Sequence, residues 1–165
     1  MIVSNSDFVG KYALALTQYN VDLIDSYISR YEPYYLNQLL GANLNNLLQA
    51  ELLVNNPPTT PIYKIIYDPL TYDFYPQVIS TLGIKEMLIG FIYYHYILDK
   101  QQNQTPIGTT YPNAENSNVL TLNSITINRF NESIESFKGI QQYIQDHISD
   151  YPTYNGQYLG YEYNW

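Results

Sequence analysis

The chain has 165 residues and a formal net charge of −8, with seven Lys plus Arg against fifteen Asp plus Glu. A protein that grips nucleic acid by neutralising phosphates needs clustered Lys and Arg, so this balance argues against that class, although it allows a surface past which DNA slides. Cysteine is absent, which excludes disulfide scaffolds, thiolate metal sites and cysteine nucleophiles.

Tyrosine is the unusual part of the composition, with 20 residues in a chain that has only 13% charged residues. Its side chain joins a large rigid apolar body to a polar tip and is favoured where protein surfaces meet. The sequence starts without a basic segment followed by an apolar core, and its most apolar stretch is too short for a membrane span. We expect one soluble domain, made in the cytoplasm, that takes part in an assembly.

The first third of the chain predicts helices. A short helix is expected at about residues 6–16, where apolar residues recur at helical spacing behind a capping residue. An amphipathic helix follows over residues 22–40, with a kink or a new start at Pro33 and a stop at Gly41. Another helix, capped by Asn43, extends through about residue 52.

The middle of the chain predicts a loop, a strand and one long helix. Three prolines make residues 55–61 a loop, and the apolar run 62–67 is interpreted as a short strand. Asp68-Pro69 and Tyr75-Pro76 are typical of turns. The strongest helical pattern spans residues 83–100, and its buried face is expected to hold Ile84, Met87, Leu88, Phe91, Tyr94, His95 and Leu98.

Residues 101–123 form a long polar segment with few core residues, which is typical of a binding loop or an arm. Within it, residues 119–122 could add a β-strand to a neighbour. The last helix is expected over about residues 124–148. The fold class is therefore all-α: a small helical bundle, residues 1–148, with a long inserted arm and an extended aromatic tail, residues 149–165.

The aromatic tail allows three interpretations. In the first, Tyr154, Tyr158 and Trp165 fold back and close the protein's own core. In the second, the tail is extended and docks in a groove on another protein. In the third, the rings form a platform that stacks on sugars, although such platforms usually lie on rigid sheets.

Candidate catalytic groups are few. His95 lies on an apolar helix face without a second His or carboxylate beside it, so a structural role is expected. His147 falls at the end of the last helix, where a protonated imidazole would favour the negative helix terminus. The sequence has no phosphate-binding loop, G-x-S-x-G or H-E-x-x-H motif. We therefore expect no enzymatic activity, no metal and no cofactor.

Several segments resemble a family of short neck proteins from tailed bacteriophages of Bacteroidota, including crAss-like phages. They span nearly the whole chain, with residues 21–75 the least diagnostic part, and none is a chemical signature. The matching segments are IVSNSDFVGKY (2–12), GIKEMLIGFIYY (83–94), TPIG (105–108), NAENS (113–117), RFNE (129–132), FKGIQ (137–141) and YNGQ (154–157).

The resemblance implies a head–tail connector, also called an adaptor or head-completion protein. Such proteins form a ring, on the order of a dozen copies, beneath the portal, give the next neck or tail protein a platform, and line the channel through which DNA is ejected without being bound. The family fold, a small helical bundle with a long loop and an extended C-terminal segment, agrees with the arm and the tail. The expected location is the neck of the virion, away from any membrane.

The same resemblance implies roles for named residues of the arm and the tail. The arm is expected to contact the next copy in the ring, through Thr105, Pro106, Ile107, Gly108, Asn116, Val119, Leu120 and Leu122. The tail is expected to dock on the portal, through Tyr151, Tyr154, Tyr158, Tyr161, Tyr163 and Trp165. An alternative is a carbohydrate- or receptor-binding module of the virion, in which Tyr158 and Trp165 would contact a bacterial polysaccharide.

Overall fold

A computed structural model describes residues 1–14, 18–100, 103–105, 108–110 and 124–157. Most of this part of the chain is helical, which confirms the all-α class, with two small antiparallel hairpins added. The α-helices and strands are α1 (Gln18–Val54), α2 (Pro61–Tyr67), β1 (Leu70–Phe74), β2 (Gln77–Thr81), α3 (Gly83–Lys100), β3 (Asn103–Thr105), β4 (Gly108–Thr110) and α4 (Ser124–Asp146). Three short 3-10 turns complete the list: η1 (Asn5–Asp7), η2 (Gly10–Tyr12) and η3 (Ile148–Asp150).

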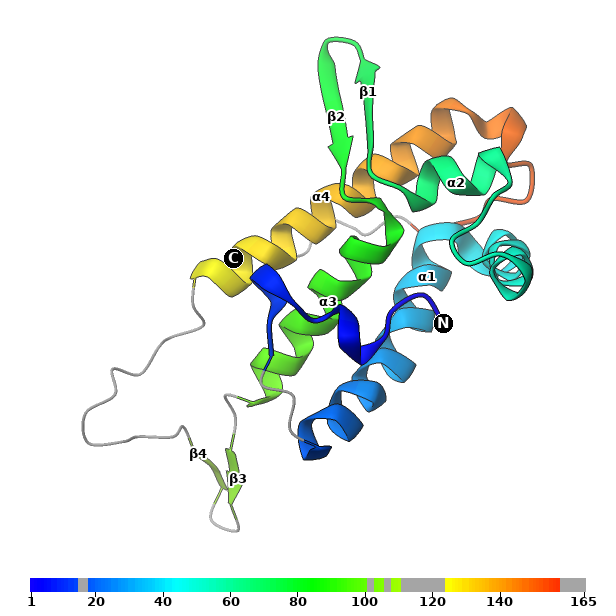
Figure 1. The fold of residues 1–165 in the computed structure, drawn as a ribbon. Coiled ribbons are helices and arrows are strands. Elements are labelled where there is room, and N and C mark those ends of the chain that lie inside the picture. Colours follow the sequence, from blue (N-terminus) through cyan, green and yellow to red (C-terminus); the bar gives the residue numbers. More distant parts are fainter. Residues whose placement is uncertain (15–17, 101–102, 106–107, 111–123, 158–165) are drawn as a thin grey trace.

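Helix α3 is the centre of the bundle and lies between α1 and α4 (Figure 1). Its Phe91 is fully buried and stacks on Tyr35 of α1 at a centroid distance of 4.0 Å. On the other side it meets Phe130 and Phe137 of α4 edge-on, at 5.4 and 6.3 Å. One aromatic ring therefore joins all three long helices, and it belongs to the face that periodicity predicts.

Two helix boundaries agree closely with the sequence pattern. Helix α3 begins at Gly83 and ends at Lys100, as predicted. Helix α1 is interrupted at Gly41, whose φ of 74° and ψ of 165° are outside the helical region, so the predicted stop there is confirmed. Pro33, by contrast, starts no new helix, because the backbone of α1 is helical on both sides of it.

The predicted helix over residues 6–16 is wrong where the structure describes it. Two separate 3-10 turns occupy this region, and Val9 between them is extended, with φ −125° and ψ 171°. Gly10 follows with a φ of 58°, in the left-handed region, so a continuous helix cannot pass this point. Capping residues here begin a turn instead of a helix.

The predicted strand over residues 62–67 is also wrong, because these residues form α2. Pro61 occupies the first turn of α2, where its fixed φ suits a helix start and its missing N–H costs nothing. Ile66 and Tyr67 are buried, and α2 contacts α3. Periodicity alone cannot tell whether a run of six residues, five of them apolar, is a strand or a short buried helix.

A hairpin follows α2 that the pattern did not predict, apart from its turn at Tyr75-Pro76. Strands β1 and β2 pair antiparallel, from Leu70 opposite Thr81 at the base to Phe74 opposite Gln77 beside the turn. This hairpin stands out from the helical body (Figure 1).

Among the described helices, none is long and apolar enough to cross a membrane.

Candidate functional site

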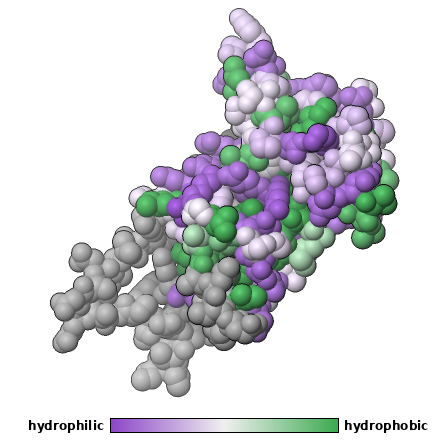
Figure 2. Space-filling view, in the orientation of Figure 1, coloured by the Kyte–Doolittle hydropathy of each residue, from purple (hydrophilic) through white to green (hydrophobic). Residues whose placement is uncertain are grey.

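The β1–β2 hairpin carries the most exposed large apolar side chain among the described residues. Tyr75 at its turn is 95% exposed and Val78 beside it is 65% exposed, while Phe74 is partly exposed. Figure 2 shows the hairpin rising away from the rest of the surface. An isolated two-stranded hairpin is marginal in water, so its stability must come from its base or from a partner at its tip.

The base of the hairpin is held against α4. Tyr72 meets the ring of Tyr143 edge-on at 5.3 Å and donates a hydrogen bond to the carbonyl oxygen of Gly139, at 3.2 Å. Gly139 lets the hairpin approach the helix, because a Cβ there would lie only 2.9 Å from the side chain of Ile79. Just past β2, the backbone N–H of Leu82 donates to Ser136, at 2.9 Å. The base is fixed and the tip is left to solvent.

A second apolar area lies at the end of α1 and beside α2. Leu53 and Val54 of α1 are largely exposed, and apolar residues gather at that edge of the molecule in Figure 2. At the junction of α2 and β1, a hollow of about 340 Å³ is lined mainly by apolar groups, including Ile65 and Leu70. The ion pair between Lys64 and Asp68, 2.7 Å long, lies among the residues that line the hollow. The hairpin tip and this hollow are at opposite ends of the same hairpin.

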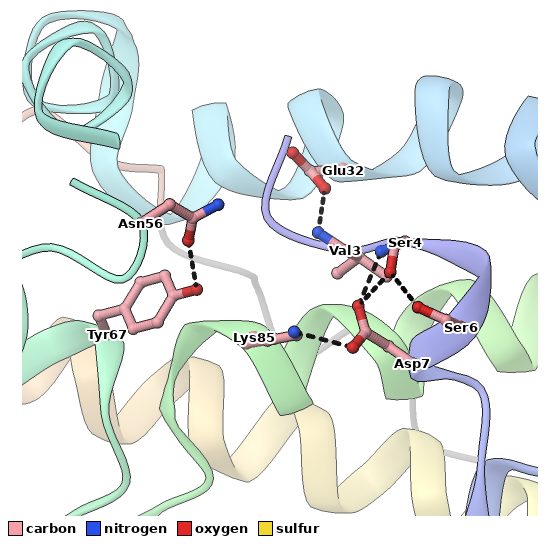
Figure 3. A network of polar contacts seen from close by, with 8 residues as sticks. All are labelled: Val3, Ser4, Ser6, Asp7, Glu32, Asn56, Tyr67 and Lys85. Carbon is pink, nitrogen blue, oxygen red and sulfur yellow. Dashed lines mark hydrogen bonds and ion pairs between the residues drawn. The ribbon is translucent and has the colours of Figure 1, made fainter. Parts of the chain in front are cut away.

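The N-terminal residues are anchored by a buried carboxylate (Figure 3). Glu32 of α1 is only 5% exposed, and it accepts hydrogen bonds from the backbone N–H groups of Ile2 and Val3, each 2.9 Å long. Because each carboxylate oxygen takes one N–H, both buried donors are satisfied. Glu32 therefore fixes residues 2 and 3 on α1, and both of its carboxylate oxygens are used in this contact.

A hollow of about 470 Å³ lies beside this anchor and contains the ion pair between Asp7 and Lys85, 2.8 Å long. Burial alone would raise the pKa of Asp7, but hydrogen bonds from Lys85 and Ser4 outweigh it and hold that pKa below its usual value. Across the hollow, the hydroxyl of Tyr67 donates to Asn56, at 3.4 Å (Figure 3). Both charged groups are paired with each other, which is typical of an anchor rather than a catalytic site.

His95, for which the sequence predicts a structural role, lies among aromatic side chains. Its ring stacks on Tyr31 at 3.9 Å, and its Nε2 shares a hydrogen bond of 2.7 Å with the Tyr35 hydroxyl. Burial lowers the pKa of His95, so the neutral imidazole is favoured. Asp99, one turn further on, instead accepts a hydrogen bond from Tyr27, at 2.6 Å. His95 therefore contributes packing and one partly buried hydrogen bond.

His147 lies between α4 and η3, where its ring stacks on Tyr143 at 4.2 Å. Its Nδ1 is 2.9 Å from the carbonyl oxygen of Tyr143, which also accepts the backbone N–H of His147, at 3.1 Å. Within the residues that the structure describes, no group of three or more His, Cys, Asp or Glu could hold a metal ion.

The described part of the tail is packed on the bundle. Tyr151 is 2% exposed, and its hydroxyl donates to the carbonyl oxygen of Ile62 in α2, at 2.7 Å. Tyr154 is half-buried against the core. In this conformation Tyr151 has no surface to offer a portal, because it already completes the protein's own core. The placement of Tyr154 favours the fold-back interpretation, and Tyr151, which that interpretation did not include, is also part of the core.

The other residues assigned to the tail contact fall outside the described part of the chain, so that assignment remains a prediction. They are Tyr158, Tyr161, Tyr163 and Trp165. Of the arm residues, Thr105 and Gly108 pair across the β3–β4 hairpin. The remaining arm residues, Pro106, Ile107, Asn116, Val119, Leu120 and Leu122, also lie beyond the described ranges, and their interface role stays a prediction.

The sequence interpretation missed the hairpin tip, the most accessible apolar group in the described structure. The available signal was a Tyr-Pro turn flanked by two runs rich in Thr, Tyr, Phe, Val and Ile, which is the pattern of a hairpin. No protein-family model matches the chain, nor does any curated protein or solved structure. The resemblance to phage neck proteins therefore depends on the quoted sequence segments alone.

Proposed function

We propose that the protein is a structural subunit of a phage neck. Copies form a ring that joins the portal to the next neck or tail protein and lines the DNA exit channel. The observation that carries this proposal is the β1–β2 hairpin, which is fixed at its base and presents Tyr75 and Val78 to solvent. A projecting hairpin with an apolar tip is typical of a surface that contacts another protein, and the tip of the β1–β2 hairpin packs on nothing within the described part of the monomer.

A ring needs one contact repeated around an axis, so each subunit must carry two different complementary patches. The hairpin tip supplies a projecting patch, and the hollow at the α2–β1 junction supplies a concave one. Because the two lie at opposite ends of the hairpin, insertion of a tip into the next hollow is a head-to-tail contact that can propagate. Such a contact closes into a ring when the rotation between copies allows it.

The charge of the chain suits a channel that DNA passes through. With a net charge of −8, the average surface repels phosphate, so DNA is not held by the counterion release that drives non-specific binding. Contacts between copies then depend on aromatic rings and amides, which salt screens less than it screens charge pairs.

The test is the mass of the purified protein as a function of concentration, measured by sedimentation. Full burial of Val78 in a contact stabilises it by about 1.5 kcal/mol or more, so Val78→Asp should weaken self-association at least about tenfold. The matched control is Ile148→Asp, which places the same charge at an exposed apolar residue of η3. A protein that remains monomeric at every concentration, with and without other neck proteins, would refute the proposal. Equal effects of the two variants would refute the role of the hairpin.

A second candidate function, saccharide binding, is favoured by one observation. A hollow of about 140 Å³ on α4 is lined by Gln141, Gln142, Gln145 and Lys138, with the half-buried ring of Tyr154 beside them. Amides next to an aromatic ring are a common way of binding sugars. Saturable binding of a bacterial polysaccharide that is lost in Gln145→Ala would support this function. If no polysaccharide binds, saccharide binding is refuted and the neck subunit is the one proposal left.

A further inference from the structure

The hydroxyl of Tyr35 meets a base that can take up its proton. It lies 2.7 Å from Nε2 of His95, and Tyr35 is only 6% exposed, so its ring is shielded from water. Burial lowers the pKa of His95, which keeps the imidazole neutral near neutral pH. With the ring proton on Nδ1, Nε2 is the acceptor of this hydrogen bond.

Other tyrosine hydroxyls of the described chain donate to poorer bases. Tyr72 and Tyr151 donate to backbone carbonyl oxygens, and Tyr67 donates to the oxygen of a side-chain amide. A carbonyl or amide oxygen takes up no proton near neutral pH. Tyr27 donates to Asp99, a carboxylate, which is ordinarily a weaker base than an imidazole. Among these partners, the imidazole is therefore the one best suited to accept a phenolic proton.

Tyr35 also belongs to a series of rings that reaches the surface. Tyr34 meets it edge-on, with ring centroids 5.0 Å apart, and Tyr34 is 51% exposed. On the inner side, Phe91 stacks on Tyr35 at 4.0 Å. Rings in contact are close enough for an electron to pass between them, so a radical formed at Tyr35 has a path to solvent through Tyr34.

We propose that Tyr35 and His95 form a site for the one-electron oxidation of tyrosine, and that Tyr34 carries the oxidation to the surface. A soluble one-electron oxidant removes one electron from Tyr35 while the phenolic proton moves to Nε2 of His95, which leaves a neutral tyrosyl radical and an imidazolium. Tyr34 then gives one electron to the radical and one proton to water, and the imidazolium returns its proton to Tyr35. The net loss is one electron and one proton from Tyr34.

The base matters because the pair is largely buried. A phenol that loses an electron and keeps its proton becomes a radical cation, and a positive charge on a buried ring is costly. Transfer of the proton places the charge on His95 instead, where the carboxylate of Asp99 favours it, although Arg30 acts in the opposite direction. The process is independent of ring formation, and it leads oxidation away from the buried core to one half-exposed tyrosine.

The test oxidises the full-length protein with a photogenerated ruthenium(III) tris-bipyridyl complex, with persulfate as the sacrificial acceptor, and maps the oxidised tyrosines by peptide mass spectrometry. His95→Phe keeps an aromatic ring at this position and removes the base, so oxidation of Tyr34 and Tyr35 should fall several-fold. Tyr75 is 95% exposed and reacts directly with the oxidant, so its oxidation should stay as in the wild type.

The matched control is His147→Phe, which removes the other histidine of the chain. That imidazole also stacks on a tyrosine ring, 4.2 Å from Tyr143, but its Nδ1 contacts a backbone carbonyl oxygen instead of a hydroxyl. We expect His147→Phe to leave the oxidation of Tyr34 and Tyr35 unchanged. Undiminished oxidation of both tyrosines in His95→Phe, or an equal loss in His147→Phe, would overturn the proposal.

A second measurement decides the matter if His95→Phe loses the far-UV circular dichroism of the wild type. Tyr34→Phe changes a ring that is already half exposed, so the fold should survive, and phenylalanine has no phenolic proton to lose. The tyrosyl radical detected by electron paramagnetic resonance should then decay several-fold more slowly, because Tyr35 has lost its path to solvent. Decay at the wild-type rate would overturn the proposal.

Discussion

Replacing Glu32 by Gln tests whether the buried carboxylate anchors the N-terminal residues. The two carboxylate oxygens accept one N–H each, from Ile2 and Val3, at 2.9 Å. Glutamine keeps one acceptor and turns an NH₂ group toward the other N–H, which leaves that donor unsatisfied. A buried unsatisfied donor costs about 1–3 kcal/mol. For a chain of this size, each kcal/mol lowers Tm by roughly 2–4 °C.

Urea unfolding followed by circular dichroism measures this loss, and Glu51→Gln is the matched control. Glu51 also accepts two backbone N–H groups, from Thr59 and Thr60, but both bonds, of 3.1 and 3.0 Å, go to the same oxygen. Glutamine can keep both bonds with that one oxygen, and the site is open to water. We expect Glu32→Gln to lower the unfolding midpoint clearly more than Glu51→Gln does. Equal midpoints would refute the reasoning.

Three further predictions concern the core. Tyr151→Phe removes the donor to the carbonyl of Ile62, so it should lower the free energy of unfolding by about 1–2 kcal/mol in urea; no change would place the tail outside the core. Burial lowers the pKa of His95, so the unfolded chain takes up the proton first; stability should fall as pH drops below about 6.5, and His95→Gln should flatten that slope in the pH dependence of Tm. Gly90→Ala would drive a Cβ into Ser133, so unfolding should become easier by about 1–3 kcal/mol; an unchanged midpoint would mean that α3 and α4 can separate there at little cost.

The helices were predictable where periodicity extended over many turns. The helical pattern of residues 83–100 repeats over five turns, and α3 has the same bounds. Its apolar residues pack on both α1 and α4, so the tertiary structure favours the same helix. Gly41 was predictable as a stop, since its φ of 74° is unfavourable for other residues. In both cases the signal is local in sequence and agrees with the tertiary packing.

Short elements were not predictable in the same way. The apolar run 62–67 suits a strand and a helix equally, and its packing against α3 decides for the helix. The strands of the β1–β2 hairpin are mostly exposed on both faces, so they lack the alternation of a half-buried sheet. In the tail, the sequence pattern does not distinguish a core residue from a docking residue. That distinction comes from contacts between residues distant in sequence, such as the one between Tyr151 and Ile62.

Photo-crosslinking from the hairpin tip tests the central claim most directly. A photoreactive aromatic residue is placed at position 75 of the full-length protein, at a concentration at which sedimentation detects association. We expect crosslinks between copies that map to the α2–β1 hollow, around Ile65 and Leu70, with position 148 as an exposed control site that gives none there. Crosslinks that stay within one copy, or that join copies equally from both positions, would contradict a ring built through the hairpin.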